Sequence, residues 1–413
     1  MLNTLETLPV EPFALAGLTP REAVRPHDVA QAAQAIARAH AESWAVVPWG
    51  GGSHQGLGNA PSRYDLALLT SGLTRIRDHQ PADLTLTVEA GATLQQVQGA
   101  LAPHGQYLPL EVEDPARATI GGLLATNLAG PLRFSHGTPR DLTLWIEALR
   151  PDGTLVHGGA KVVKSVAGYD TPKLFIGSLG SVGLITAATF KVAPLPETRR
   201  MVLLGFREAD HTEEVLAKLL AGGYDPSLLT LVWGATQLGD YIDTSPWILA
   251  IGADGPRATT DWQVEAFAAL GREFGTMSVR TLDESETLRV RRALMANRAL
   301  GEVSVKLNLA PNQLARVLGH LDRRGQFEYL RVFCEAGNGV VRIAGNVPTD
   351  WWREMAVFAT EIGGTWTLER APLELKRGVD VWGPERGDRA LMRQLKAALD
   401  PTSTLNPGRF AGG

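Results

Sequence analysis

Short apolar runs separated by glycine-rich or polar connections predict strands through the first half of the chain. Alternation of apolar residues with threonine, as in LTLTVE at residues 84–89, is typical of a strand. Two capped segments predict helices, at residues 29–40 behind Asp28 and at residues 94–101 behind Thr93. The strands predicted in this half are residues 44–47, 64–69, 84–89, 142–149, 154–157 and 184–192.

The second half repeats one order of elements. Residues 201–282 and 302–370 each predict strand, helix, strand, strand, helix, strand, which is the split-βαβ order. A basic helix at residues 286–300 separates the two sets. Two such sets can join their sheets into one antiparallel layer with helices on one face, as a cap domain. The expected fold class is α+β, and residues 389–399 predict a last amphipathic helix.

The segment PWGGGSHQGLG, residues 48–58 and here called the glycine loop, holds five of the 44 glycines within nine positions. Consecutive glycines let backbone N–H groups turn toward a ligand, which suits a phosphate or pyrophosphate. The alternative is a mobile turn between two strands. A nicotinamide-type GxGxxG site needs a helix directly after the glycines. A strand follows both this loop and the later glycines at 177, 180 and 183, so we reject that assignment.

Composition narrows the classes of function. The 413 residues, 44% hydrophobic and 20% charged, are typical of a globular protein of two or three domains. A formal net charge of −4 gives no basic field for nucleic acid. One cysteine, Cys334, excludes an internal disulfide or a cysteine-ligated cluster, and its apolar neighbours predict a buried strand residue. The first 20 residues lack Lys and Arg, so we expect a cytoplasmic protein whose membrane contact, if any, goes through a partner.

Blocks of sequence in a fixed order resemble a known family. The glycine loop is followed by TIGGLLATN, HGTPRDLTLWIEALRPDG, VVKSVAGYD and GSLGSVGLITAATFKVAPLP. Together they resemble the PCMH-type FAD-binding domain of the vanillyl-alcohol oxidase superfamily, over residues 28–196. Within it the chain is similar to the flavin subunits of bacterial glycolate oxidase, the smaller one above all. The resemblance implies an N-terminal extension (1–27), an FAD-binding domain (28–197), a cap (198–385) and a C-terminal segment (386–413) that returns to the FAD domain.

The family's motifs imply FAD contacts at the residues of this chain that match them. Those in the glycine loop are Pro48, Gly50, Gly51, Gly52, Ser53, His54, Gly56 and Gly58. Those further along are Thr119, Gly121, Gly122, Ala125, Asn127, Gly130, Gly137, Arg140, Asp141, Lys164, Gly168, Tyr169, Gly183, Ile185 and, in LDPTSTLNPGR near the end, Asn406. Some relatives attach FAD through a histidine near the loop, but His54 lies two residues past that position, so non-covalent FAD is favoured.

The cap departs from the catalytic relatives. Their histidine-rich blocks, like HxGDGNxH and EHG, correspond here to CEAGNGVVR and ERAP, which hold no histidine. We therefore expect no metal site. Arg331, Arg342, Arg370 and Arg377 are candidate carboxylate anchors, or else surface charges, and Arg370 is the candidate catalytic residue because it occupies the matching slot.

These features favour an FAD-binding subunit of a 2-hydroxy acid dehydrogenase complex of the glycolate oxidase type. Together with this chain, a sister flavin subunit would oxidise glycolate or D-lactate, and an iron–sulfur subunit would take the electrons. In this hypothesis the sister subunit carries the hydroxy-acid chemistry, and the flavin of this chain relays electrons or mainly supports assembly. One alternative is a self-sufficient FAD-dependent oxidoreductase for an alcohol or hydroxy acid. Another is a flavin-binding scaffold without turnover.

Overall fold

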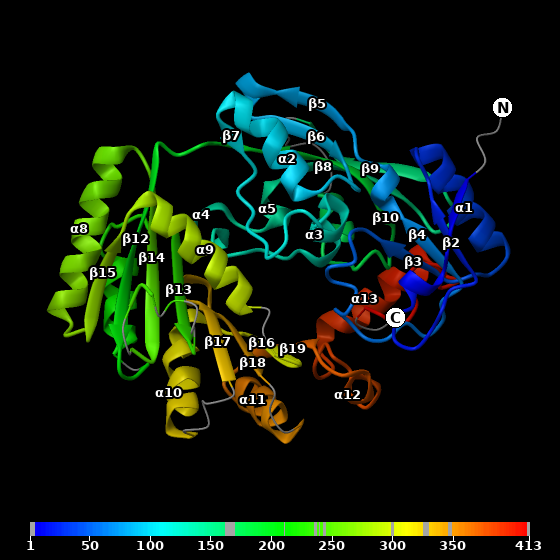
Figure 1. The fold of residues 1–413 in the computed structure, drawn as a ribbon. Helices are drawn as coiled ribbons and strands as arrows, with labels where there is room; N and C mark the ends of the chain where they lie inside the picture. Colours follow the sequence, from blue (N-terminus) through cyan, green and yellow to red (C-terminus); the bar gives the residue numbers. More distant parts are fainter. Residues whose placement is uncertain are drawn as a thin grey trace. The chain divides into compact units, whose positions relative to one another are not determined.

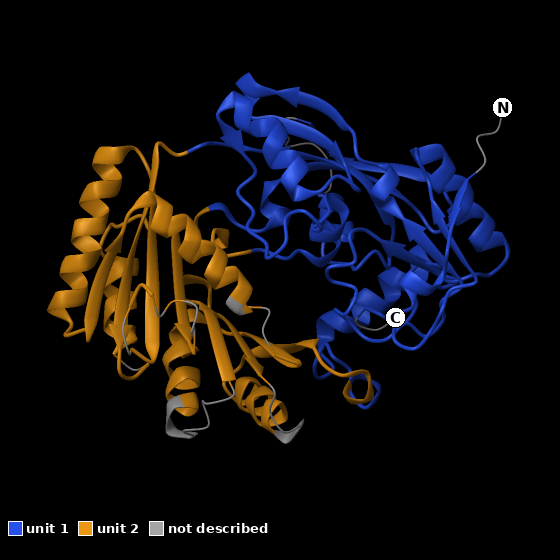
Figure 2. Cartoon of the chain, in the orientation of Figure 1, with its two compact units in different colours: residues 1–129, 136–195, 376–413 blue, residues 130–135, 196–375 orange. Residues whose placement is uncertain are grey.

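The computed structural model describes residues 5–161, 170–209, 211–234, 238, 240–242, 245–298, 301–324, 330–345 and 349–410. Figure 1 labels the helices and strands in chain order. The chain divides into two compact units, coloured separately in Figure 2. The first unit comprises residues 1–129, 136–195 and 376–413, and the second comprises residues 130–135 and 196–375.

The first unit is built on two main sheets. Its strands are β1 (Glu6–Leu8), β2 (Glu22–Arg25), β3 (Val46–Trp49), β4 (Leu66–Leu69), β5 (Ile76–Gln80), β6 (Thr85–Glu89), β7 (Gln106–Tyr107), β8 (Thr143–Leu149), β9 (Leu155–Gly159), β10 (Leu184–Lys191) and β11 (Ala193–Pro194). Its helices are α1 (Val29–Ala41), α2 (Leu94–Leu101), α3 (Ile120–Thr126), α5 (Pro139–Leu142), α6 (Pro172–Phe175) and α13 (Gly387–Leu399). The short helices α4 (Arg133–His136) and α12 (Leu373–Arg377) fall where the sequence passes from one unit to the other.

The smaller sheet has the order β1–β2–β4–β3, and β4 runs parallel to both β2 and β3. Helix α1 begins where the sequence predicts, because the Asp28 carboxylate accepts the backbone N–H of Gln31. Its buried residues Ala32, Ala35 and Ile36 pack in one core with the sheet. The C-terminal segment joins this core through Leu405, which forms a parallel bridge to Val46.

The larger sheet, β5–β6–β10–β8–β9, is antiparallel throughout. Helix α2 starts with a capping box in which Thr93 and Gln96 satisfy each other's backbone N–H groups, as the sequence predicts. Helices α2 and α3 bury Val97 and Leu124 in the core beneath this sheet. The sheet thereby holds the start of α3 and the start of β10 in fixed positions.

The second unit is one antiparallel sheet of eight strands, in the order β15–β12–β14–β13–β17–β18–β16–β19. The strands are β12 (Thr198–Phe206), β13 (Leu228–Trp233), β14 (Trp247–Gly255), β15 (Ser278–Leu282), β16 (Val303–Asn308), β17 (Leu330–Glu335), β18 (Val340–Gly345) and β19 (Thr365–Arg370). The two predicted βαββαβ sets join edge to edge, with Leu231 of β13 opposite Cys334 of β17. The predicted joining of their sheets is confirmed.

Four helices cover one face of this sheet: α7 (Thr212–Ala221), α8 (Arg257–Glu273), α10 (Leu314–Arg324) and α11 (Thr349–Glu361). The helices of the two predicted sets thus share one face, as expected, whereas the helix between the sets, α9 (Glu284–Arg298), lies elsewhere. Its residues Val290 and Leu294 pack with Met201, Leu203 and Phe333 on the opposite face. Those strand residues also present an apolar surface, which α9 covers.

Candidate functional site

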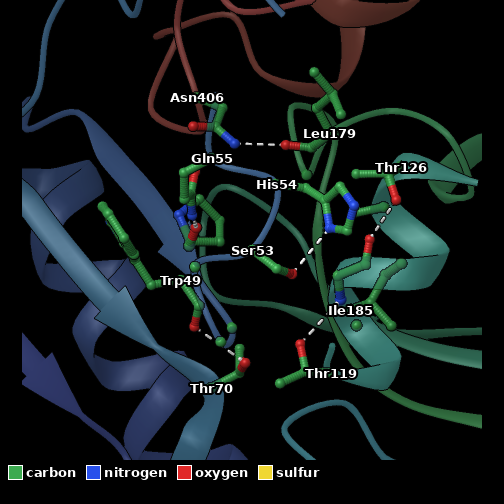
Figure 3. A pocket seen from close by; sticks show the side chains of 18 of the residues that line it. Trp49, Ser53, His54, Gln55, Thr70, Thr119, Thr126, Leu179, Ile185 and Asn406 are labelled. Carbon is green, nitrogen blue, oxygen red and sulfur yellow. Dashed lines mark hydrogen bonds between the residues drawn. The ribbon is translucent and has the colours of Figure 1, made fainter. Parts of the chain in front are cut away.

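A pocket in the first unit is formed by the glycine loop, the start of α3, the segment before and at the start of β10, and the C-terminal segment (Figure 3). Its lining residues are Pro48, Trp49, Gly50, Gly51, Gly52, Ser53, His54, Gln55, Thr70, Thr119, Gly121, Gly122, Ala125, Thr126, Leu179, Gly180, Leu184, Ile185, Asn406 and Arg409. Segments more than 350 residues apart in sequence thus meet at one site.

The glycines of the loop are needed for close backbone packing. A Cβ atom on Gly51 would lie 1.8 Å from the carbonyl oxygen of Arg117, and one on Gly50 would lie 2.1 Å from Oγ1 of Thr119. Gly52 and Gly58 have φ angles of +72° and +87°, which residues with side chains rarely adopt. The loop is therefore a built structure and not merely a mobile turn.

Two cations hold the carbonyl groups of the loop. Nη2 of Arg409 lies 2.6 Å from the carbonyl oxygens of both Gln55 and Leu57. The ammonium of Lys376 donates to the carbonyl of Gly56 and, at 3.2 Å, to that of Gly58. Burial lowers the pKa of Arg409 to about 10 and that of Lys376 to about 8, so both are predominantly charged at neutral pH.

The start of α3 faces the same pocket. Oγ1 of Thr119 accepts the N–H of Gly122 at 3.3 Å, and the N–H of Gly121 donates to the carbonyl of Ala90 at 2.7 Å. A Cβ on Gly121 would lie 2.9 Å from that of Ala90. Small residues at this end keep the helix close to the sheet and leave the pocket open above it.

Asn406 brings a polar group to the pocket from the C-terminal segment. Its Nδ2 donates to the carbonyl of Leu179 at 2.5 Å, as Figure 3 shows, and its N–H donates to the carbonyl of Val46 at 2.9 Å. Its Oδ1 is buried without a hydrogen-bond partner among the described residues. An unsatisfied buried acceptor is costly, so this oxygen fits a donor on a bound molecule.

These residues fit FAD on observations of this chain alone. The loop offers backbone amides of glycines that no side chain shields, which suits a pyrophosphate. The Oδ1 of Asn406 offers an acceptor for an N–H of a heterocyclic ring. Ser53 and His54 lie at the rim, exposed, and Oγ of Ser53 is 2.9 Å from Nδ1 of His54.

Several residues that the resemblance implies do not line this pocket. Asn127 accepts the N–H of Arg140 at 3.1 Å, and Asp141 accepts the N–H of Thr138 at 2.8 Å. A Cβ on Gly183 would lie 2.5 Å from the ring of Phe175. The predicted FAD-binding residues that lie outside the pocket lining are Gly56, Gly58, Asn127, Gly130, Gly137, Arg140, Asp141 and Gly183. Their contact with FAD stays a prediction. Lys164, Gly168 and Tyr169 lie outside the described residues.

Arg409 and Gln55 line the pocket but were not predicted from the sequence. Arg409 stands at the end of the phrase LDPTSTLNPGR, three residues after Asn406. Only its basic character within that phrase could have drawn attention to it. The partner carbonyls at Gln55 and Leu57 carry no side-chain signal, so nothing in the sequence pairs the two segments.

The predicted features of the second unit have mixed outcomes. Cys334 is fully buried in β17 as predicted, and burial raises the pKa of its thiol. Arg370 is exposed at the end of β19, where Nη1 donates to the carbonyl of Gly301 at 3.4 Å, and its catalytic role stays a prediction. Arg342 is buried between two glutamates. No group of three or more described His, Cys, Asp or Glu side chains is placed to hold a metal ion.

Hydropathy adds one finding on the helices. Of the helices that the structure describes, none combines the length and apolar character required to cross a bilayer.

Comparison with known proteins identifies two domains in the chain. Residues 20–159 match the model of the FAD binding domain, and residues 382–410 match that of the C-terminal domain of FAD linked oxidases. The chain is 27% identical over 393 residues to glycolate oxidase subunit GlcD of Bacillus subtilis, covering 88% of this chain and 83% of that one. It is 25% identical to D-lactate dehydrogenase of Archaeoglobus fulgidus, covering 94% and 90%.

Two further comparisons concern part of the sequence and the fold. Over 181 residues the chain is 31% identical to glycolate oxidase subunit GlcE of Escherichia coli, covering 44% of this chain and 49% of that one. The solved structure of alkyldihydroxyacetonephosphate synthase superposes with a TM-score of 0.70 at 17% identity, covering 94% of this chain and 76% of that one, which shows a shared fold. The two matched models cover the glycine loop and the C-terminal segment that carries Asn406 and Arg409. The resemblance drawn from the sequence is confirmed: the chain contains the FAD binding domain and the C-terminal domain of FAD linked oxidases, and its cofactor is FAD.

Proposed function

We propose that this chain takes part in the oxidation of a 2-hydroxy acid, glycolate or D-lactate, to the 2-oxo acid. The observation that carries the proposal is that relatives named for these reactions match both units and not the FAD-binding domain alone. Oxidation of the CH–OH group removes two electrons and two protons from the substrate. FAD, when bound, supplies the chemistry that accepts the electron pair.

The chain's own residues bind and orient the cofactor in this proposal. The glycine loop presents its amides to the pyrophosphate, while Arg409 and Lys376 bind carbonyl groups of the loop. Thr119 and Asn406 define the pocket from the start of α3 and from the C-terminal segment. Because His54 is exposed at the rim, we propose that FAD is held without a covalent bond.

We further propose that the chain works in a complex with a sister flavin subunit and an iron–sulfur subunit. The similarity to both GlcD and GlcE supports a multi-subunit arrangement. A single cysteine, fully buried, cannot supply the ligands of an iron–sulfur cluster, so the acceptor cluster belongs to another chain. The proposed location is the cytoplasm, with membrane contact only through partners.

A self-sufficient dehydrogenase is the second candidate. It is favoured by the match to D-lactate dehydrogenase, which spans 90% of that protein's length with a single chain. The two candidates predict different behaviour of the purified chain with glycolate or D-lactate and a dye acceptor. Turnover by the chain alone supports the second candidate, and turnover that requires the partner subunits supports the first. A flavin that is never reduced by either acid, with or without partners, contradicts both.

A further inference from the structure

A polar atom inside the pocket of the first unit has no partner, and it belongs to Asn406 of the C-terminal segment. The residue is 3% exposed and lines the pocket, yet its Oδ1 accepts no hydrogen bond from the residues that the structure describes. A buried acceptor without a donor destabilises the folded protein. The bound molecule must therefore bring a donor to this oxygen.

The contacts of the amide fix its orientation. Its Nδ2 donates to the carbonyl of Leu179 at 2.5 Å (Figure 3), and its backbone N–H donates to the carbonyl of Val46 at 2.9 Å. Exchanging the oxygen and nitrogen of the amide would set Oδ1 against the carbonyl of Leu179, so that two acceptors would face each other. The φ angle of +45° is one that asparagine adopts more readily than most residues. Oδ1 is thus held as an acceptor.

The end of the pocket around Asn406 is enclosed and apolar. Leu184 packs in the core beside the smaller sheet and Ile185 in the core beneath the larger one, so this end lies where the two cores meet. Gly180 keeps it open, since a Cβ there would lie 3.4 Å from Cγ of Pro48 and 3.7 Å from Nδ2 of Asn406. The apolar lining residues at this end are Pro48, Leu179, Leu184 and Ile185.

FAD has two heterocyclic rings, and they need different surroundings. The isoalloxazine exchanges electrons with a substrate or an acceptor, so it needs an open approach, whereas adenine takes no part in the redox chemistry and can be enclosed. The N–H of the isoalloxazine also lies between two carbonyl oxygens, which need donors of their own. The apolar side chains around Asn406 supply none. The enclosed end of the pocket therefore fits adenine.

We propose that Oδ1 of Asn406 accepts a hydrogen bond from the exocyclic amine of the adenine of FAD and so selects adenine over other purines. Hypoxanthine or guanine would bring a carbonyl oxygen to the same place, and two acceptors cannot share a hydrogen. Asn406 is then a specificity-determining residue for the cofactor. The inference rests on FAD alone and is independent of which hydroxy acid is oxidised.

The test measures nucleotide binding by the full chain after removal of FAD, with ADP and IDP as probes. The two share ribose and pyrophosphate, but IDP carries a carbonyl oxygen where ADP carries the amine. Each nucleotide competes with FAD, and recovery of flavin fluorescence gives its inhibition constant. We expect the wild type to bind ADP about 10–100-fold more tightly than IDP, because IDP leaves a buried acceptor unpaired.

Two variants at Asn406 and one control isolate the acceptor. Asn406→Gly removes it and keeps the backbone conformation, since glycine adopts a positive φ without strain, and the preference for ADP should vanish. Asn406→Asp keeps an acceptor and should retain the preference. Ser403→Gly, at a φ of +50° in the same segment and outside the pocket lining, should match the wild type. A merely structural role of Asn406 would weaken both nucleotides equally, and an unchanged ratio in Asn406→Gly would overturn the proposal.

FMN, which lacks adenine, distinguishes the two rings of the cofactor. Asn406→Gly should bind FMN as the wild type does. Weaker binding of FMN by Asn406→Gly, with the ratio of ADP to IDP unchanged, would overturn the proposal in favour of the isoalloxazine. Equal binding of ADP and IDP by the wild type would also overturn it. None of these measurements involves a hydroxy acid, so their failure is distinct from failure of the proposed function.

Discussion

Nη1 of Arg409 lies 2.7 Å from Oε1 of Gln55, and its Nη2 lies 2.6 Å from the main-chain oxygen of the same residue. The guanidinium of Arg409, near the C-terminus, therefore binds both the side chain and the backbone of Gln55 in the glycine loop. The carbonyl of Arg409 in turn accepts the N–H of Asn59 at 3.1 Å, just after the loop. The C-terminal segment thus acts as a support for the loop.

Replacing that guanidinium should weaken cofactor binding. Arg409→Ala leaves the carbonyls of Gln55 and Leu57 without their charged donor, which costs about 1.5–3 kcal/mol for such a hydrogen bond. We expect the Kd for FAD to rise about 10–100-fold, measured by quenching of flavin fluorescence. Arg386→Ala, at a surface pair with Asp388, serves as the control and should bind FAD like the wild type. Equal Kd values for both variants would refute a supporting role of Arg409.

Two glycines of the same loop should respond differently to a methyl group. Gly51→Ala places Cβ 1.8 Å from the carbonyl oxygen of Arg117, so the backbone must move. Gly56→Ala meets no atom within 4 Å. Overpacking costs about 1–3 kcal/mol, and we expect Gly51→Ala to lower FAD occupancy on purification while Gly56→Ala keeps it. The absorbance ratio of flavin to protein checks this, and full occupancy in both variants would show that the pocket does not need the close approach of Gly51 to Arg117.

Sequence signals that act over a few neighbouring residues predicted the helices and the glycine loop well. Asp28 and Thr93 mark the starts of α1 and α2 because a capping side chain acts within its own turn of helix. The glycine loop was located because its residues are contiguous in the sequence. Features that depend on partners distant in sequence were not predicted. The side of the sheet that α9 covers is set by apolar residues such as Met201 and Phe333, which lie on separate strands.

The residues of the candidate site show the same difference: local motifs were predicted, whereas contacts between distant segments were not. Gly50 and Thr119 could be named from motifs, but their contact between distant segments could not. Arg409 was missed because its partners are backbone carbonyls, which every residue has. Arg342 was named from the sequence, but its charged neighbours were not, since strand register sets Lys306 opposite Arg342.

Non-covalent attachment of FAD can be checked directly. His54 is exposed and its Nδ1 lies 2.9 Å from Oγ of Ser53. We expect precipitation of the holoprotein with trichloroacetic acid to leave the yellow flavin in the supernatant. Flavin retained in the washed pellet of the wild type, and absent from the pellet of His54→Ala, would instead indicate a covalent bond at this histidine.

A buried ion pair should stabilise the C-terminal segment. Nζ of Lys396 donates to Asp400 at 2.5 Å and to the carbonyls of Ser181 and Leu405 at 2.7 and 2.9 Å. Lys396→Met leaves a buried carboxylate without its cation, a change that costs about 3–5 kcal/mol. We expect the urea concentration that releases FAD to fall clearly. Lys173→Met, at an exposed pair with Asp170, should shift it little.

Glu369 should make the second unit sensitive to acid. Its pKa of about 2 in the folded chain, against 4.5 for the free side chain, means that the unfolded state binds more protons between these values. The stabilisation is present above pH 4.5 and is lost as pH falls toward 2. We expect Glu369→Gln to unfold with a shallower pH dependence over this range, followed by tryptophan fluorescence in urea. Glu361→Gln, at an exposed carboxylate of α11, should keep the slope of the wild type. Parallel slopes for Glu369→Gln and the wild type would show that Arg342 does not stabilise the ionised carboxylate.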